Sequence, residues 1–261
     1  MNMSQFQKAE YFASLHVAGN PLLLQNAWDA GSAKAIAGAG GKAIATSSWA
    51  VAAAHGYEDG EAIPLELAQM IVGRIAATTD LPVTVDVEGG YSDEDPVLAG
   101  NISRFLDAGV VGINFEDRIV AGTGLYGVER QAARIAAIRA MTTARAIPLF
   151  INARTDLFLG TDGGHASLMD EAKRRADAYA AAGASGFFVP GLSDDGLIAE
   201  ICAASTLPIN VMVMDGVSPA DRLAALGVAR ISYGPIPYME TMAGLASAVR
   251  DELSPSAKAA A

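Results

Sequence analysis

The sequence is poor in cysteine, in aromatic residues and in positive charge, and each shortage excludes a class of protein. One cysteine in 261 residues rules out an internal disulfide framework and is typical of a protein of the reducing cytoplasm. Lysine and arginine together number 18 against 29 aspartates and glutamates, which gives a net charge of -11. Nucleic acids and acidic membrane surfaces bind basic patches, so we expect neither as a partner.

Long apolar runs are also missing, although the chain as a whole is apolar. Hydrophobic residues make up 51% of the sequence, yet no run reaches the roughly 20 apolar residues that span a bilayer. The first twenty residues have neither the basic start nor the apolar centre of a signal peptide. We therefore expect a cytoplasmic globular protein with one large hydrophobic core.

Short apolar runs alternate with longer alanine-rich segments of helical period, which predicts strands that alternate with helices in one domain over residues 1–261. The expected strands are 22–27, 42–48, 82–88, 110–116, 148–154, 185–191, 208–214 and 229–234. The expected helices are 31–39, 64–79, 94–108, 128–145, 166–182, 194–205, 218–226 and 238–252. Glycines that follow alanine or leucine at helix ends are expected to be C-terminal caps, namely Gly40, Gly109, Gly183 and Gly227.

Eight strand–helix units of this kind predict an α/β fold, a (β/α)8 or TIM barrel. An extra N-terminal helix at about residues 4–17 is expected to pack beneath the barrel. An open doubly wound sheet produces the same alternation and is the alternative. The regular repeat of the units and their continuous apolar strands favour the barrel. Its active site would lie at the carboxyl ends of the strands.

One of these strand ends carries a concentration of acids. The segment VDVEGGYSDED, residues 85–95, holds five acidic residues and no basic one, directly after an apolar run. Asp86 and Glu88 are two apart on the expected strand, so their side chains should face the same way. Glu116 ends the neighbouring strand, and Asp59 lies in the loop after the second strand.

Four carboxylates with no lysine, histidine or cysteine beside them suit Mg²⁺ or Mn²⁺ and not zinc. A structural network of ion pairs is the alternative, because it also offsets the cost of burying carboxylates. The acids of residues 93–95 stand just before Pro96 and a helical segment, and we expect them to cap that helix.

Four motifs resemble those of the isocitrate lyase/phosphoenolpyruvate mutase superfamily, in the same order. They are Ser-Ser at 47–48 with GYED at 56–59, VDVEGGY at 85–91, NFED at 114–117 and NARTD at 152–156. The resemblance covers nearly the whole chain. It implies a Mg²⁺-dependent barrel that makes or breaks C–C or P–C bonds on 2-oxo acids. It also implies a homo-oligomer, a dimer or a tetramer with exchanged C-terminal helices.

The resemblance extends to single residues. It implies that Asp86 is the direct metal ligand and that three further carboxylates contact the ion mainly through water, namely Asp59, Glu88 and Glu116. Ser47 and Ser48 match the segment that grips the substrate carboxylate. Arg154 matches the arginine that neutralises the oxo oxygen, and an ion pair with Asp156 is its alternative role. The expected substrate-binding set is completed by Trp49, Asn26, Asn152 and Asn210.

The loop after NFED departs from the lyases of the superfamily. Those enzymes carry a loop of the Lys-x-Cys-Gly-His type, whereas residues 117–127 read DRIVAGTGLYG. The stretch GTGLYG matches a dinucleotide fingerprint formally, but no strand runs straight into it, so a mobile lid is the better interpretation. Proton transfer then falls to Tyr126, Thr123 or water held by the metal, since Cys202 lies in a helical pattern and is expected to be a core residue.

These features predict a Mg²⁺-dependent enzyme that acts on a small 2-oxo mono- or dicarboxylate or its adduct. The reaction expected is that of a C–C lyase, decarboxylase or acyl hydrolase, with Arg154, Asp59 and Glu116 among the catalytic residues. P–C bond chemistry, of the phosphonopyruvate hydrolase or phosphoenolpyruvate mutase kind, is the first alternative. A non-catalytic barrel that binds an oxo acid is the second.

Overall fold

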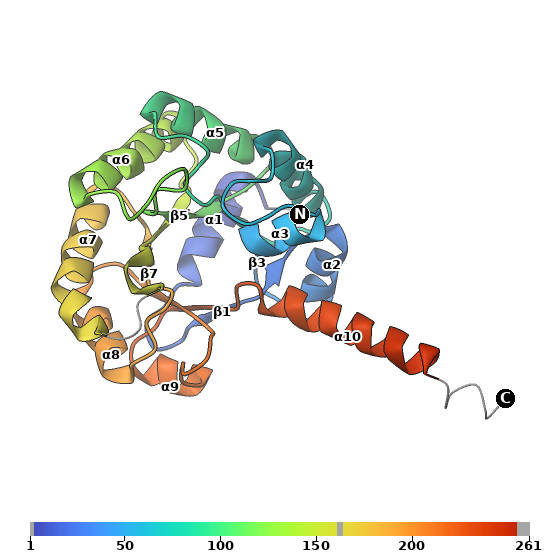
Figure 1. Cartoon of the computed structure of the whole chain (residues 1–261). Helices are drawn as coiled ribbons and strands as arrows, with labels where there is room; N and C mark the ends of the chain where they lie inside the picture. Colours follow the sequence, from blue (N-terminus) through green and yellow to red (C-terminus); the bar gives the residue numbers. More distant parts are fainter. Residues whose placement is uncertain (1–2, 161–163, 255–261) are drawn as a thin grey trace.

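A computed structural model of the chain describes residues 3–160 and 164–254. Within them nine parallel strands form one sheet in the order β1-β9-β8-β7-β6-β5-β4-β3-β2. Only Gln25 separates β1 from β2, and the two act as halves of one strand, because β1 pairs with β9 while β2 pairs with β3. The sheet therefore closes into a (β/α)8 barrel, as expected, and the helices form a ring around it (Figure 1).

The strands are β1 (Leu22–Leu24), β2 (Asn26–Ala27), β3 (Ile44–Thr46), β4 (Val83–Asp86), β5 (Gly112–Glu116), β6 (Phe150–Arg154), β7 (Gly186–Phe188), β8 (Ile209–Met212) and β9 (Arg230–Ser232). The helices are α1 (Gln5–Ser14), α2 (Ala30–Gly38), α3 (Ser48–Ala54), α4 (Leu65–Ala76), α5 (Asp95–Asp107), α6 (Val128–Ala144), α7 (Met169–Ala181), α8 (Asp195–Ala204), α9 (Ala220–Ala225) and α10 (Ile236–Leu253). Short 3-10 turns cover Asp156–Phe158 and His165–Leu168.

Most element predictions are confirmed, with ends shifted by a few residues. The four glycines expected as C-terminal caps all have φ between 89° and 98°, the left-handed conformation that such caps require. Helix α3 was not expected, because its residues follow a strand directly and were assigned to a loop. The Ser47 hydroxyl accepts a hydrogen bond from the Ala50 N–H and so begins this helix at once.

The expectation that residues 93–95 cap the next helix is wrong. No side chain makes a capping hydrogen bond at the start of α5. Asp95 instead forms an ion pair with Arg130 at 2.8 Å, and Arg130 also donates to the Asp93 carbonyl. The basic partner comes from α6, a helix that the local sequence around Asp95 does not reveal.

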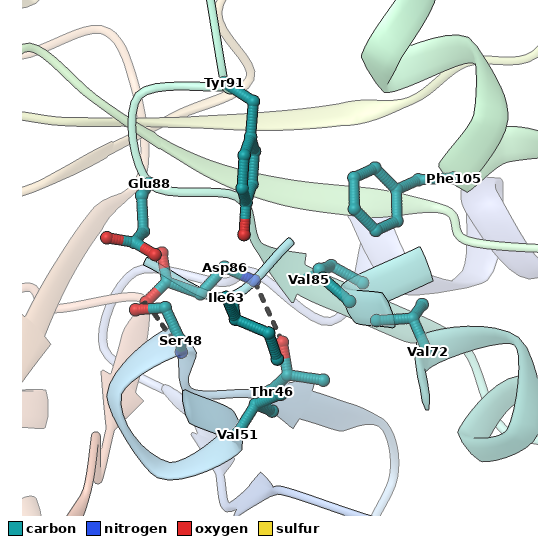
Figure 2. Close-up of a pocket in the computed structure, with 11 residues that line it drawn as sticks. Thr46, Ser48, Val51, Ile63, Val72, Val85, Asp86, Glu88, Tyr91 and Phe105 are labelled. Carbon is teal, nitrogen blue, oxygen red and sulfur yellow. Dashed lines mark hydrogen bonds between the residues drawn. The ribbon is translucent and has the colours of Figure 1, made fainter. Parts of the chain in front are cut away.

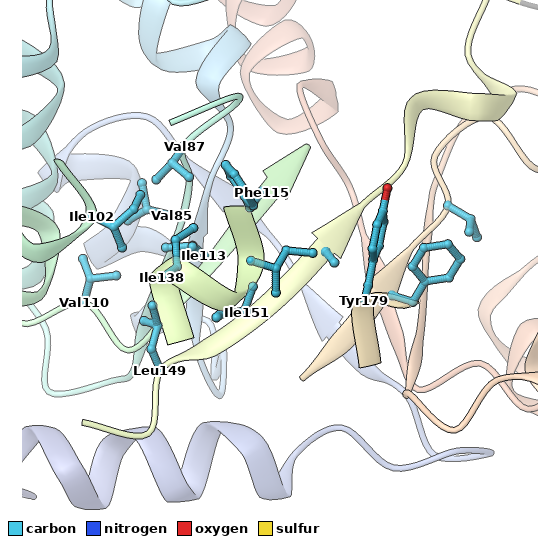
Figure 3. Packing of buried hydrophobic residues seen from close by; sticks show 14 of the residues in the cluster. Val85, Val87, Ile102, Val110, Ile113, Phe115, Ile138, Leu149, Ile151 and Tyr179 are labelled. Atoms are coloured by element: carbon cyan, nitrogen blue, oxygen red, sulfur yellow. The ribbon is translucent and has the colours of Figure 1, made fainter. Parts of the chain in front are cut away.

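Two apolar layers make the core. The larger one lies between the strands and the surrounding helices, where Val85, Ile113 and Ile151 pack against residues such as Ile102 and Ile138 (Figure 3). The smaller one fills the amino-terminal end of the barrel. Its members are Ala9, Phe12, Leu22, Leu24, Ala43, Ala45, Val111 and Phe150. The barrel is thus closed by packed side chains at one end and is polar only towards the other.

Helix α1 supplies the plug at the closed end, as the sequence predicts. Phe12 is fully buried and meets Phe150 edge to face, with ring centroids 5.5 Å apart. The Gln5 amide donates hydrogen bonds to the carbonyls of Leu106 and Val110, which fixes the start of the helix against the barrel. In Figure 1 this helix crosses behind the strands.

Helix α10 is the one element that leaves the barrel. It extends away from the other helices, and none of its described residues is buried (Figure 1). Near its start the Tyr238 ring contacts Trp28, and further along Leu245 and Val249 are exposed by 59% and 47%. No helix of the described residues is long and apolar enough to cross a membrane.

The outer face of β1 has no helix of the described chain over it. Leu23 is 49% exposed there, and a groove of about 680 Å³ runs between this strand and α2. Ile36 and Ala39 form its other wall. An apolar groove and an uncovered helix with exposed apolar side chains therefore occur in the same subunit.

His16, just after α1, is partly buried, and its ring is neutral. Its ring stacks on Phe150 at 4.0 Å, Nδ1 lies 2.9 Å from the Phe12 carbonyl, and Nε2 has no hydrogen-bond partner among the described residues. Burial, and then the charge of Arg230, lowers the pKa of His16 from 6.5 to about 3. Between these two values the unfolded chain binds a proton that the folded one does not, so stability falls as the pH falls.

We predict that in His16→Phe, which keeps the stacked ring, the free energy of unfolding depends less on pH than in wild type. Wild type should lose up to about 1.4 kcal/mol of unfolding free energy per pH unit below 6.5 through this residue, and the variant should not. Urea unfolding at about pH 7 and about pH 4.5 measures the difference. His55→Gln, at an exposed histidine, is the control. Equal pH dependence in wild type and His16→Phe would contradict the prediction.

Candidate functional site

A pocket opens at the carboxyl ends of the strands, where the barrel rule places an active site. Its volume is about 180 Å³, below the roughly 300–1,000 Å³ of pockets for drug-sized ligands, so it suits a small molecule. We call it the rim pocket. It is lined by Asn26, Ser47, Ser48, Trp49, Asp59, Asp86, Asn114, Arg154, Phe188, Met212, Ser232, Gly234 and Pro235.

Asp86 ends β4 and lies at the wall of this pocket. Its Oδ2 accepts hydrogen bonds from the Ser48 hydroxyl at 3.0 Å and from the Ser48 N–H at 3.4 Å (Figure 2). The Asp86 N–H donates to the Thr46 hydroxyl, which fixes the residue between β3 and α3. Its Oδ1 is buried and has no hydrogen-bond partner among the described residues. A buried carboxylate oxygen without a partner is costly, unless a ligand or an ion satisfies it.

Arg154 ends β6 and brings positive charge to the same pocket. Its Nε and Nη2 donate to the two Asp156 oxygens at 2.6 and 2.9 Å, and Nη1 lies 3.0 Å from Glu116 Oε2 and 4.0 Å from Asp86 Oδ2. Burial alone would lower the pKa of Arg154, but the charges of Glu116, Asp156 and Asp86 raise it. The ion pair considered as an alternative role is therefore present, and the guanidinium still lines the pocket.

The turn after β4 is strained. Glu88 and Tyr91 have φ of 51° and 60°, values that side chains other than glycine adopt at a cost of order 1–3 kcal/mol each. Gly90 between them has φ of 82°, and a Cβ there would lie 2.3 Å from Leu98. Glu61 holds the turn, because its Oε1 accepts the Tyr91 N–H at 2.7 Å and its N–H donates to Glu88 Oε2 at 2.9 Å.

This turn changes the position expected for Glu88. The strand ends at Asp86, so the alternation that predicted Asp86 and Glu88 side by side does not continue. Glu88 lines a smaller cavity behind Asp86, and only Asp86 of the two lines the rim pocket. In Figure 2 the Tyr91 hydroxyl points into this second cavity, towards Asp86.

The carboxylates around Asp86 interact through their charges. Burial, and then the charges of Asp86 and Asp59, raises the pKa of Glu88 to about 8. Burial raises the pKa of Glu116, although the Arg154 charge offsets part of the rise. Burial and the Asp86 charge raise the pKa of Asp59 as well. Each carboxylate disfavours the charged form of the others, so a cation among them would be stabilising.

The residues present fit a Mg²⁺ ion held by few direct contacts. No three His, Cys, Asp or Glu side chains of the described chain are grouped to hold an ion by themselves. Mg²⁺ usually keeps several waters and is bound through one or two carboxylates plus groups of the substrate. Asp86, with its unpartnered Oδ1, can serve as the direct ligand. Asp59, Glu88 and Glu116 are near enough for charge interaction and suit contact through water.

A layer of buried polar residues supports the pocket from inside the barrel. Asn152 and Arg230 both donate to Asn114 Oδ1, at 2.9 and 3.0 Å, and Asn210 exchanges hydrogen bonds with Ser232. Asn114 and Ser232 line the rim pocket, whereas Asn152 and Asn210, expected to bind substrate, do not line it and hydrogen-bond to these two residues instead. Asn26 lines the pocket as expected, and its amide donates to the Thr46 carbonyl at 2.8 Å.

Tyr126 and Thr123, the expected proton donors, lie outside the rim pocket. The Tyr126 ring covers the Arg134 guanidinium at 4.3 Å and lines a separate hollow beside α6, and Thr123 is exposed. Asp117 fixes the start of this loop, because it is fully buried and accepts hydrogen bonds from Arg175 and Tyr179. A catalytic role for Tyr126 or Thr123 requires the loop to move over the pocket.

Six pocket residues were not singled out from the sequence, namely Asn114, Phe188, Met212, Ser232, Gly234 and Pro235. Asn114 has the same orientation on β5 as Glu116, so strand alternation alone would have found it. Phe188 and Met212 are apolar strand residues that resemble core residues in sequence. Cys202 is partly buried in α8 beside the larger apolar layer, where burial raises the pKa of its thiol to about 11.

Comparison with known proteins places this site in a family. The model of the phosphoenolpyruvate phosphomutase family matches residues 12–253. A crystal structure from Burkholderia cenocepacia J2315, provisionally assigned as a phosphonomutase, is 48% identical with a TM-score of 0.91, over 93% of this chain and 99% of that one. An uncharacterized protein of Mycobacterium tuberculosis is 35% identical over 240 residues, which is 92% of this chain and 87% of that protein.

Relatives with named activities are more distant. The 2-methylisocitrate lyase of Escherichia coli K12 is 28% identical over 244 residues, 88% of this chain and 79% of the lyase. A phosphonopyruvate hydrolase solved with oxalate and Mg²⁺ shares the fold, with a TM-score of 0.82 at 19% identity over 94% of this chain and 86% of that one. Together with the motifs at the rim, these matches show that the chain belongs to the phosphoenolpyruvate phosphomutase family, within the isocitrate lyase/phosphoenolpyruvate mutase superfamily.

Proposed function

We propose that the protein is a Mg²⁺-dependent enzyme that makes or breaks a C–C bond of a small 2-oxo acid. The observation that carries the proposal is the unpartnered, buried Oδ1 of Asp86 beside Arg154 in the rim pocket. A chelating 2-oxo acid offers two adjacent oxygens to a cation at this carboxylate. The phosphonopyruvate hydrolase that shares the fold was solved with oxalate, a chelating acid of this type, and with Mg²⁺.

The four carboxylates would hold the ion, with Asp86 in direct contact and Asp59, Glu88 and Glu116 acting through water. Bound Mg²⁺ would polarise the oxo group and neutralise negative charge on its oxygen, and Mn²⁺ is the alternative ion. Glu116 has a second duty in this scheme, because it orients Arg154 through their 3.0 Å contact.

Arg154 would stabilise the oxo oxygen as negative charge develops on it. The two hydrogen bonds from Arg154 to Asp156 fix the guanidinium plane in advance, so little reorganisation is needed during the reaction. Ser47, Ser48, Trp49 and Asn26 surround the remaining space and would bind the substrate carboxylate and carbon chain. Asn152 and Asn210 would position Asn114 and Ser232 through their hydrogen bonds. Loop closure would bring Tyr126 or Thr123 to the proton that is transferred.

P–C bond chemistry is the second candidate. The observation that favours it is the 48% identity with the structure provisionally assigned as a phosphonomutase. Turnover assays with phosphonopyruvate, with 2-oxo acids and with their hydroxy adducts, each with Mg²⁺ and with chelator, separate the two reactions. A protein that binds these acids in a Mg²⁺-dependent manner but converts none of them would instead be the non-catalytic barrel considered from the sequence.

We also propose that the protein is a cytoplasmic homo-oligomer in which α10 of one subunit covers the groove beside β1 of another. Helix α10 exposes Leu245 and Val249, and the groove exposes Leu23, within the same chain. When two copies exchange helices, the exposed apolar helix of one copy and the exposed apolar groove of the other bury each other's apolar surface. A dimer exchanges one pair of helices, and a tetramer combines two such pairs.

The metal assignment predicts the outcome of Asp86→Asn. This substitution keeps the size of the side chain but removes its charge, so Mg²⁺-dependent oxalate binding should weaken by about 100-fold or more. Isothermal titration calorimetry with Mg²⁺ and with chelator measures the effect, and a thermal melt reports the fold. Asp195→Asn, at a carboxylate paired with Arg222, is the control. Oxalate affinity that is equal in Asp86→Asn and wild type would refute the assignment.

The role of Arg154 predicts the outcome of Arg154→Lys. Lysine keeps the positive charge but cannot donate two parallel hydrogen bonds to Asp156, so its charge would not be fixed at the oxo oxygen. We expect kcat/KM to fall by about 100-fold, the usual effect of removing one preorganised donor. Steady-state kinetics on the best substrate provide the measurement. A fully active variant would limit Arg154 to its structural ion pair.

The exchange of α10 predicts that Leu245→Glu and Leu23→Glu each lower the molecular mass in solution. One substitution puts a charge on the exposed face of α10 and the other puts it in the groove, so both oppose the same contact. Light scattering after size exclusion reports the mass. Val97→Glu, at a 47% exposed position of α5, is the matched control and should leave the assembly intact. An unchanged mass in both test variants would show that the oligomer forms elsewhere or not at all.

A further inference from the structure

The rim pocket has a polar half and an apolar half, and this division carries information about the substrate. The ring of strands places β4 opposite β8, because they are four positions apart in the closed eight-strand barrel. Asp86 and Arg154 stand at the ends of β4 and β6. The apolar side chains continue round the ring from there: Phe188 ends β7 beside Arg154, its partner in the strand register, Met212 ends β8 across from Asp86, and Pro235 follows β9.

All positive charge that lines the pocket is on the polar side. Arg154 is the one lysine or arginine among the described lining residues, and Asp156 and Glu116 already neutralise it. Arg230 is a further cation inside the barrel, but it is 1% exposed and is not among the lining residues. Its Nε donates to Ser232 and its Nη2 to Asn114, two residues that do line the pocket, and its buried Nη1 has no partner among the described residues.

The orientation of a bound 2-oxo acid follows from the proposed function, on which this inference rests. The carboxylate and oxo oxygens belong beside Asp86, Ser48 and Arg154, and the rest of the molecule then extends towards β7 and β8. A second carboxylate would meet the Phe188 ring and the Met212 side chain, where the one lining cation, Arg154 beside Phe188, is already paired with Glu116 and Asp156. Burying an unpaired charge is unfavourable, whereas burying a methyl group against these side chains is favourable.

We propose that the substrate is a 2-oxo monocarboxylate, or an adduct of one, whose tail beyond the oxo carbon is uncharged and apolar. The tail contacts Phe188, Met212 and Pro235. This narrows the sequence-based expectation, which left mono- and dicarboxylates open. It also disfavours phosphonopyruvate, whose phosphonate would put negative charge on the same wall.

The test compares two acids that differ only at the tail. 2-Oxopentanoate and 2-oxoglutarate share a five-carbon 2-oxo acid chain, which ends in a methyl group in the first and in a carboxylate in the second. With Mg²⁺ present, calorimetry on the full-length protein should show at least about tenfold tighter binding of 2-oxopentanoate. Oxalate, which has the polar head and no tail, is titrated in parallel.

The two proposals fail in different ways in this experiment. If oxalate does not bind with Mg²⁺, the proposed function is wrong, and the proposal of a 2-oxo monocarboxylate substrate is wrong as well. If oxalate binds and 2-oxoglutarate binds as tightly as 2-oxopentanoate or more tightly, the proposed function is retained, and the proposal that the substrate has an apolar tail is wrong.

A charge placed on the apolar wall gives an independent readout. Met212→Lys should raise the affinity for 2-oxoglutarate relative to 2-oxopentanoate by about tenfold, because it supplies the missing cation. Met214→Lys adds the same charge two residues further on, at a 36% exposed side chain outside the pocket lining, and should leave the ratio unchanged. A thermal melt confirms that each variant is folded. An equal ratio in wild type and a folded Met212→Lys protein would overturn the proposal.

Discussion

Compensation of buried negative charge is the constraint on which the mouth of this barrel depends. Asp86, Glu116 and Asp156 converge on one guanidinium, that of Arg154, while Asp59 and Glu88 lie nearby with carboxyl pKa values that burial and the neighbouring acids raise. One arginine cannot neutralise five carboxylates. A bound cation would offset the remaining repulsion, which is the role proposed for Mg²⁺ at Asp86.

The interior of the barrel changes gradually from apolar to charged along its axis. Phe12 and Phe150 close the amino-terminal end, where His16 is kept neutral. Asn114 and Arg230 belong to the middle layer, and there burial lowers the pKa of Arg230 to about 9. Each layer supports the next one, because the polar side chains of the middle layer hydrogen-bond to residues that line the pocket. A rigid lower barrel thus positions the side chains that would meet a substrate.

Hydrogen bonds of the Glu61 and Glu88 side chains explain the backbone strain at the turn after β4. Glu61 accepts the Tyr91 N–H and donates its own N–H to Glu88, which holds both residues at positive φ. Glycine suits position 90 because its φ is 82°, and a Cβ there would also press on the Leu98 side chain. Strain of this kind persists where surrounding contacts fix it, and it is frequent at functional sites. Here it separates Glu88 from the rim pocket and leaves Asp86 as the carboxylate of this turn that faces the pocket.

The sequence by itself determined the barrel, the glycines that end four of its helices and the strand ends at Asp86 and Glu116. These features depend on local periodicity and on short motifs, so a single chain reveals them, as the φ values of Gly40 and Gly227 show. Only the tertiary structure decided which polar residues meet. Glu88 does not line the rim pocket, because its side chain accepts a hydrogen bond from the N–H of Glu61, 27 residues away in the sequence. The Tyr126 ring packs on the Arg134 guanidinium in a cation–π contact. That Phe188 and Met212 line the pocket is visible only in the closed barrel, since in sequence these two residues do not differ from core residues.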